Sequence, residues 1–344
     1  MVVKKDIRSL SIDQLKEILE ENSFQSFRAK QIYHWLWKKS SHDFSSMHNL
    51  PKKLLTFLEN NFVIRNIEIS KQQKSKDGTI KNAIKLFDDL IVECVLIPSK
   101  DRITACVSSQ VGCSLNCKFC ATARLKRMRN LNADEIYDQV VLIAKQSQDF
   151  YKRPLTNIVF MGMGEPLMNY KNVTNAIEMI TSNEGLGMSS KRIVLSTSGV
   201  PKMIKKMADD KVKFKLAVSL HSAINETRTS IMPFNAKMDL TELGDSLVYW
   251  YDKTKSLVTY EYVVWKGVND KEEDIDALVN FCKKIPSKVN LIQYNSIDDP
   301  NFIQAPDKTL FKYVSSLEKN NITATIRMSR GNDIDAACGQ LANK

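Results

Sequence analysis

The chain has 344 residues, enough for about two domains, and its 43% hydrophobic and 26% charged residues exclude a disordered or collagen-like protein. No stretch approaches the ~20 apolar residues of a membrane span, and the start lacks a secretory signal, so we expect a cytoplasmic protein with no membrane partner. Lys and Arg number 50 against 39 Asp and Glu, a net charge of +11 that favours a polyanionic partner such as nucleic acid.

Residues 1–60 are predicted to form a small helical domain, because apolar residues recur at helical spacing around Leu19 and again around Ile32. Residues 61–98 change to β-rich runs, and Asp77-Gly78 is a turn signal between two of them. This pattern predicts a short antiparallel meander that links the helical domain to the rest of the chain.

Residues 99–344 alternate between apolar strand patterns and helical patterns, which predicts βαβ units and a parallel sheet. Six such units are too few for an eight-fold barrel, so an α/β fold is expected, either an open, partial (βα)6 barrel or a doubly wound sheet. Both architectures collect their chemistry at the carboxyl ends of the strands. Strands are predicted at 103–109, 157–163, 191–197, 213–221, 258–265, 288–295 and 322–329, and helices at 134–148, 171–183, 201–209, 241–255, 271–285 and 307–321.

Three cysteines lie close together directly after the first predicted strand of this region, in Cys113-Ser-Leu-Asn-Cys117-Lys-Phe-Cys120. In a reducing compartment such thiols indicate a metal site rather than disulfides. Structural zinc normally takes four ligands, and no second pair is nearby. Three thiolates suit a [4Fe–4S] cluster with one iron left open, and zinc remains the alternative.

Four further motifs accompany these cysteines: Phe27-Arg-Ala-Lys-Gln-Ile-Tyr33, Cys106-Val-Ser-Ser-Gln-Val-Gly-Cys113, Gly162-Met-Gly-Glu-Pro-Leu167 and Arg330-Gly-Asn-Asp-Ile-Asp-Ala-Ala-Cys338-Gly-Gln-Leu341. In this order they resemble the RlmN family, radical S-adenosylmethionine (SAM) enzymes that methylate C2 of adenosine in ribosomal and transfer RNA. The resemblance covers about residues 8–342.

The resemblance implies that Cys113, Cys117 and Cys120 hold a [4Fe–4S] cluster and that SAM binds its open iron. It also implies SAM contacts from residues that end several of the predicted strands. Taken without the family, Glu165 is equally explained as a helix cap and His221 as a packed core histidine. The implied SAM-binding residues are Gly164, Glu165, Ser196, Ser219, Leu220, His221 and Asn295.

The resemblance further implies a reaction that uses two SAM molecules in each turnover. One methylates Cys338; the other yields a radical that activates the S-methyl group for addition to C2 of adenine. Glu93 is implied as the acceptor of the C2 proton, and its alternative is a solvent-facing strand residue. Attack of Cys106 on the Cys338 sulfur then releases RNA and leaves a disulfide. Cys94 and Cys282 lie in apolar runs and are expected to be buried.

Two basic segments are candidates for RNA contact. The first follows the cysteines, where the segment Ala121–Asn130 departs from the small-residue stretch usual in the family; the second is an aromatic and basic run in the helical domain. The first is equally a solvated helix lead-in, and several aromatics of the second are expected in the core. The residues are Lys118, Arg124, Lys126, Arg127 and Arg129 in the first, and Arg28, Lys30, Tyr33, His34, Trp35, Trp37 and Lys38 in the second.

The partners that the resemblance implies are 23S rRNA at the peptidyl transferase centre, tRNA at the adenosine 3′ to the anticodon, and a reducing protein such as flavodoxin or ferredoxin. A monomer is expected. One rival is an enzyme of the Cfr type, which methylates C8 of the same ribosomal adenosine with shared machinery. A rival of another class is a non-enzymatic RNA-binding protein with a structural metal site.

Overall fold

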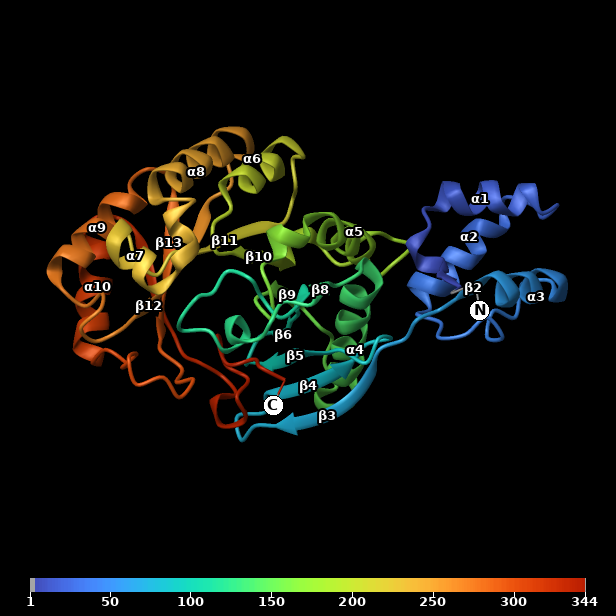
Figure 1. Cartoon of the computed structure of the whole chain (residues 1–344), viewed down its shortest axis with the longest axis horizontal. Coiled ribbons are helices and arrows are strands. Elements are labelled where there is room, and N and C mark those ends of the chain that lie inside the picture. Colours follow the sequence, from blue (N-terminus) through green and yellow to red (C-terminus); the bar gives the residue numbers. More distant parts are fainter. Residues whose placement is uncertain (1–3, 344) are drawn as a thin grey trace.

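The structure is a computed structural model that describes residues 4–343. The N-terminal elements form a lobe at one end of the molecule, drawn blue in Figure 1. Ser11 caps the first long helix through a reciprocal capping box with Gln14, and apolar side chains such as Leu15, Leu19 and Leu58 are fully buried between the helices. The elements of this lobe are β1 (Lys5–Asp6), α1 (Ile12–Glu21), α2 (Arg28–Tyr33), a π-helical turn (His34–Lys38), α3 (Lys52–Asn61) and β2 (Phe62–Val63).

A ten-stranded sheet dominates the rest of the chain, in the order β14-β13-β12-β11-β10-β9-β6-β5-β4-β3. Seven of its strands are parallel, and each pairs with the next one along the chain, as repeated βαβ units require. These are β6 (Ile103–Cys106), β9 (Asn157–Phe160), β10 (Ile193–Thr197), β11 (Lys215–Ser219), β12 (Val258–Val264), β13 (Ser287–Gln293) and β14 (Thr323–Arg327).

Helices cover the outer side of this parallel sheet, and Figure 1 shows the sheet curving without closing. The edge strands β14 and β3 do not pair with each other, so the predicted partial (βα)6 barrel is confirmed. No helix among residues 4–343 is long and apolar enough to cross a membrane. The helices are α4 (Ala133–Tyr151), α5 (Tyr170–Thr181), α6 (Pro201–Asp209), α7 (Asn225–Ile231), α8 (Leu240–Thr254), α9 (Glu272–Cys282) and α10 (Asp307–Lys319).

The β-rich segment between the lobes is an antiparallel meander of β3 (Glu68–Lys74), β4 (Ile80–Lys85) and β5 (Ile91–Pro98). It is not a free-standing connection, because β5 pairs antiparallel with β6 and so extends the barrel sheet. The division of the chain into domains at 60/61 and 98/99 stays a prediction. A short ribbon of β7 (Gln110–Val111) and β8 (Arg129–Asn130) encloses the loop that carries the three clustered cysteines.

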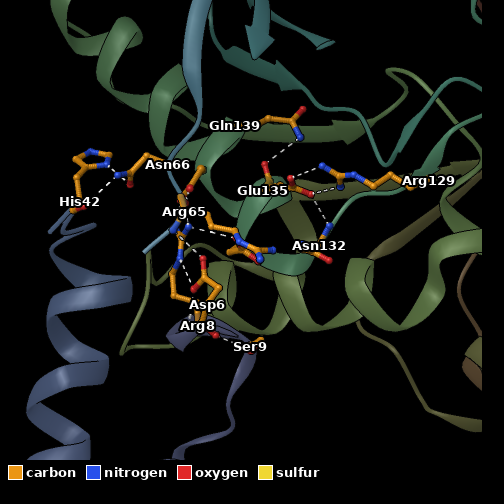
Figure 2. A network of polar contacts seen from close by, with 12 residues as sticks. Asp6, Arg8, Ser9, His42, Arg65, Asn66, Arg129, Asn132, Glu135 and Gln139 are labelled. Atoms are coloured by element: carbon orange, nitrogen blue, oxygen red, sulfur yellow. Dashed lines mark hydrogen bonds and ion pairs between the residues drawn. The ribbon is translucent and has the colours of Figure 1, made fainter. Parts of the chain in front are cut away.

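A buried ionic network joins the N-terminal lobe to helix α4 (Figure 2). The Arg8 guanidinium donates to both carboxylate oxygens of Asp138, at 2.9 and 2.8 Å, and to Asp134 at 3.2 Å. Beside it, Trp37 is 3% exposed and packs edge-on against Tyr137, with ring centroids 5.0 Å apart. The reading of Trp37 as a base-stacking residue is therefore wrong, and its alternative, a place in the core, is confirmed.

Candidate active site

A cavity of about 1090 Å³, counted to its open mouth, lies at the carboxyl ends of the parallel strands. Segments from the loop after β6 to the C-terminal tail contribute its walls. The predicted site residues that line it are Cys113, Cys117, Cys120, Gly164, Glu165, Ser196, Ser219, His221, Asn295 and Cys338.

The three clustered thiols share one wall of this cavity, where Phe119 packs between them and the barrel, 4.8 Å from the His221 ring and 5.0 Å from Trp265. Burial raises the pKa of the Cys113 thiol to about 11 and holds that of Cys117 well above its ordinary value, so bound metal is what would hold them as thiolates. Within residues 4–343 no set of His, Cys, Asp or Glu is gathered around one ion position. Three thiols on one wall of a cavity are a donor set that an iron–sulfur cluster with one open iron can use.

Close backbone packing explains the two glycines of the Gly162-to-Leu167 motif. A Cβ at Gly162 would lie 2.6 Å from Ser108 Oγ, and one at Gly164 would lie 2.5 Å from Gln110 Cβ; Gly164 also has a φ of +96°. Glu165 follows them, buried, and accepts from the backbone N–H of Leu167 at 3.0 Å and of Ser198 at 2.7 Å. Glu165 therefore caps the helical turn that follows it and also lines the cavity. Burial raises the pKa of its carboxyl.

The ends of β10 and β11 supply the next wall. The hydroxyls of Ser196 and Ser219 are 3.5 Å apart, and His221 Nδ1 accepts from the backbone N–H of Val263 at 3.1 Å. Burial lowers the pKa of His221 to about 3, so its imidazole is neutral. Leu220, predicted beside them, is fully buried and does not line the cavity.

A buried arginine that the sequence analysis did not select holds these strand ends together. Arg228 on α7 is 0% exposed and donates to the carbonyl oxygens of Ser198 at 2.6 Å and Leu220 at 3.1 Å. Its remaining strong bond is to Asn235 Oδ1. Nothing in its sequence context distinguishes Arg228 from a surface helix residue.

The two predicted redox thiols are far apart in sequence but close enough in the fold for the charge of one to affect the other. Cys106 ends β6 and is buried, whereas Cys338 is exposed on the C-terminal tail and lines the cavity. Burial raises the pKa of Cys106 to about 12, and the neighbouring Cys338 adds to the shift. Asn295, predicted to contact SAM, donates to the Cys338 carbonyl at 3.2 Å.

Arg327 and Glu261 are two further charged residues of the cavity that the sequence analysis missed. Arg327 Nη1 lies 3.5 Å from Glu261 Oε2, and the neighbouring Cys338 and Glu261 raise the pKa of Arg327. Both lie on predicted strands, at 322–329 and 258–265. A charged residue on an otherwise uncharged predicted strand is the sequence signal that could have identified both.

Glu93 lies outside the cavity lining, fully buried on β5. One oxygen accepts from the backbone N–H of Ala342 at 2.8 Å and of Asn343 at 3.1 Å. The other is 3.2 Å from Lys81 Nζ without hydrogen-bond alignment. The alternative of a solvent-facing Glu93 is wrong, whereas Cys94 and Cys282 are buried as predicted.

The basic segment after the cysteines is only partly free. Arg129 makes bidentate contacts with both Asp88 and Glu135, the latter visible in Figure 2, and Arg124 pairs with Asp299 at 2.8 Å. The remaining members are exposed, without an ion pair among the described residues: Lys118, Lys126 and Arg127. In the helical lobe, the residues of the second run that stay exposed share one helical face: Lys30, His34 and Lys38.

Comparison with known proteins assigns the chain to a family. The family model of the radical SAM superfamily matches residues 107–281, and that of the ribosomal RNA large subunit methyltransferase N-terminal domain matches residues 5–64. A curated relative from Flavobacterium psychrophilum, named as an RlmN RNA methyltransferase, is 63% identical over 100% of this chain and 99% of its own length. The chain belongs to the RlmN family.

Two more relatives agree with this family assignment. The dual-specificity RNA methyltransferase RlmN of Campylobacter hominis is 40% identical over 99% of this chain and 97% of its own length. The crystal structure of a radical SAM methyltransferase from Sphaerobacter thermophilus superimposes with a TM-score of 0.92 at 35% identity, covering 99% of this chain and 100% of that one. This RlmN-family chain is an enzyme, so the non-enzymatic alternative is wrong, and its superfamily uses a [4Fe–4S] cluster and SAM.

Proposed function

We propose that this protein methylates C2 of adenosine in 23S rRNA, at the peptidyl transferase centre, and in tRNA, at the adenosine 3′ to the anticodon. The observation that carries the proposal is the meeting of Cys338 with the three clustered thiols at one cavity, although more than 200 residues separate them in sequence. C2 is an electron-poor carbon with no nucleophilic character, so a radical route suits it.

The chain's residues divide the work in this proposal. Cys113, Cys117 and Cys120 ligate the cluster, and the two glycines, Glu165 and the serine and histidine side chains of the strand ends enclose SAM. When bound, these groups supply the methyl group and the radical that activates it, with two SAM molecules used per turnover.

Cys338 carries the methyl group in the proposed cycle and bonds to the adenine through it. After the C2 proton is lost, the Cys106 thiolate attacks the Cys338 sulfur. The S–S bond forms, the bond from that sulfur to the methylene carbon breaks, and this carbon takes up a proton to become the methyl group of the released RNA. Leu220 supports the wall of the SAM site from the core, where its backbone groups bond to Glu261 and Arg228, and Glu93 is proposed as the group that accepts the C2 proton. Because Glu93 now holds the tail N–H groups, it acts as a base only after the tail shifts.

The RNA lies, we propose, across the exposed Lys118, Lys126 and Arg127 beside the mouth of the cavity. Lys30 and His34 of the N-terminal lobe are a second contact. An acidic electron-transfer protein of the flavodoxin or ferredoxin type reduces the cluster near Lys118, and the chain acts as a monomer. Size-exclusion chromatography and reduction assays with each donor test these two points.

The decisive experiment compares Cys338→Ala with Cys106→Ala. Cys338→Ala cannot load a methyl group and forms no RNA adduct. Cys106→Ala still loads the methyl group on Cys338 and still adds to the RNA, but it cannot break the resulting covalent adduct. It therefore accumulates a nuclease-sensitive protein–RNA species, which is visible on a denaturing gel. Normal turnover by either variant contradicts the proposal, and mass analysis of the product nucleoside as 8-methyladenosine contradicts the C2 assignment.

The cluster assignment has its own test. Alanine in place of Cys113, Cys117 or Cys120 abolishes the brown chromophore and the formation of 5′-deoxyadenosine after anaerobic reconstitution with iron and sulfide. Stoichiometric zinc without iron in protein purified anaerobically contradicts it.

A further inference from the structure

The turn between β3 and β4 contacts the C-terminal tail, a feature that its sequence signal did not indicate. Asp77 uses one carboxylate oxygen within the turn, accepting from Thr79 N–H at 2.9 Å, and the other for the tail, accepting from Gly331 N–H at 2.9 Å. Lys81 Nζ donates to the Asp335 carbonyl at 3.3 Å. Figure 1 shows the red C-terminal segment against the strands of this meander.

Asp333 is the centre of this contact on the tail side. Its two carboxylate oxygens accept from the Ser75 hydroxyl at 2.6 Å and from the Lys76 backbone N–H at 3.1 Å. These donors hold the pKa of Asp333 below its ordinary value. Charge-assisted bonds of this kind are about twice as strong as neutral ones.

The backbone conformation of Gly331 and its close packing show that the tail fits tightly against the turn. Its φ is +69°, and a Cβ built there would lie 2.8 Å from both Thr79 Cγ2 and Ala336 Cβ. Only glycine therefore allows the tail to lie directly on the turn.

The far end of the tail is held by the same meander. Glu93 accepts from the last described backbone N–H groups, and Asn343 Nδ2 donates to the Ile91 carbonyl at 2.9 Å. Between the two attachments the tail arches past the cavity, where the Gly339 carbonyl accepts from Ala121 N–H at 2.7 Å. Cys338 is thus placed by anchors on both sides of it in sequence.

We propose that the turn 75–81 is a docking site for the tail 331–343, and that Ser75, Asp77 and Asp333 are positioning residues that place Cys338 over the cavity near Cys106. The inference rests on the proposed role of Cys338 as methyl carrier. These residues touch neither SAM nor RNA in the proposal and act only through the tail.

The first test measures docking without any catalysis. Trypsin cleaves after the exposed Arg330, directly before the docked Gly331, so cleavage of that bond reports the undocked fraction. Ser75→Ala and Asp333→Asn are expected to speed release of the tail peptide about five- to tenfold. Asp335→Asn is the matched control, because within residues 4–343 its carboxylate has no hydrogen bond or ion pair and asparagine tolerates its φ of +53°.

The second test measures positioning in the reconstituted enzyme. If Cys338 is displaced, SAM is still cleaved but the cleavage less often leads to a methylated adenosine. The ratio of 5′-deoxyadenosine to methylated adenosine is therefore expected to rise at least threefold in Ser75→Ala and Asp333→Asn. In Asp335→Asn the ratio stays at the value of the unmodified protein. A purely structural defect lowers both products alike, leaves the ratio unchanged, and overturns the proposal.

The docking proposal and the proposed function can be contradicted independently of each other. If both variants release the tail peptide at the control rate, the docking proposal is wrong even where Cys106→Ala still traps the RNA adduct. If the adduct never forms while the variants speed tail cleavage, docking stands and the proposed function is wrong.

Discussion

Asp134 offers a test of the interface between the N-terminal lobe and the barrel. Three carboxylates, from Asp6, Asp134 and Asp138, surround the single guanidinium of Arg8, so the group is short of positive charge. Glu135 lies beside them, and His42 is near Asp138. Burial, only partly offset by Arg8, raises the pKa of Asp134 from 3.8 to about 7.

The sign of the effect follows from this raised value. The folded state keeps the Asp134 proton at a pH where the unfolded chain has released it, so the contribution of Asp134 to stability is full below about pH 4 and is lost as the pH rises through 7. A pKa raised by about three units corresponds to about 4 kcal/mol. Asp134→Asn mimics the protonated acid at every pH and removes this loss.

The assay is urea unfolding at a series of pH values, with amide hydrogen exchange of α1 and α2 as the local readout. Asp134→Asn is expected to match the unmodified protein near pH 4 and to exceed its unfolding free energy by up to about 4 kcal/mol at pH 8. Asp13→Asn, whose carboxylate is 76% exposed, is the control with no such trend. Equal pH dependence in Asp134→Asn and the unmodified protein would refute the reasoning.

Three further predictions follow from the site and the lobe. Trp37→Ala removes the ring against Tyr137 and should lower the unfolding free energy by about 3–5 kcal/mol in urea titration. Neutral substitution of one exposed cation, Lys118, Lys126 or Arg127, should reduce the slope of log RNA affinity against log salt concentration by about 0.7–0.9. Arg129→Gln is the control and should leave this slope unchanged. Filter binding at a series of salt concentrations measures the slope. Gly164→Ala should abolish SAM binding in equilibrium dialysis, because its Cβ would lie 2.5 Å from Gln110 Cβ.

The parallel part of the fold could be predicted because its signals are local. Each strand and helix carries its own periodicity, and strict alternation leaves few topologies. The residues that the resemblance implied for SAM share one cavity for a related reason: Glu165 follows a predicted strand, Ser196 and Asn295 lie at the carboxyl ends of two others, and parallel strands end at one edge.

Contacts between distant segments could not be predicted, because no periodicity records them. Arg129 reads as a free cation in sequence, yet Asp88, 41 residues earlier, and Glu135 occupy its guanidinium. Glu93 alternates like a surface strand residue, yet the meander extends the sheet and the tail covers it. Asp77-Gly78 predicts a turn correctly, but nothing local shows that one oxygen of Asp77 is left for Gly331.

The two redox thiols differ in a way that fits the order of the proposed steps. In the proposed cycle Cys338 receives the methyl group and meets RNA first, and it is exposed at the cavity. Cys106, which acts last, is buried, and its pKa near 12 keeps it a thiol while the earlier steps proceed. Of its charged neighbours, Arg327 favours the Cys106 thiolate, whereas a Cys338 thiolate opposes it. A Cys338 sulfur bonded to carbon carries no such charge, so in the proposed cycle this opposition to the Cys106 thiolate ends when the methyl group is loaded, before Cys106 has to act.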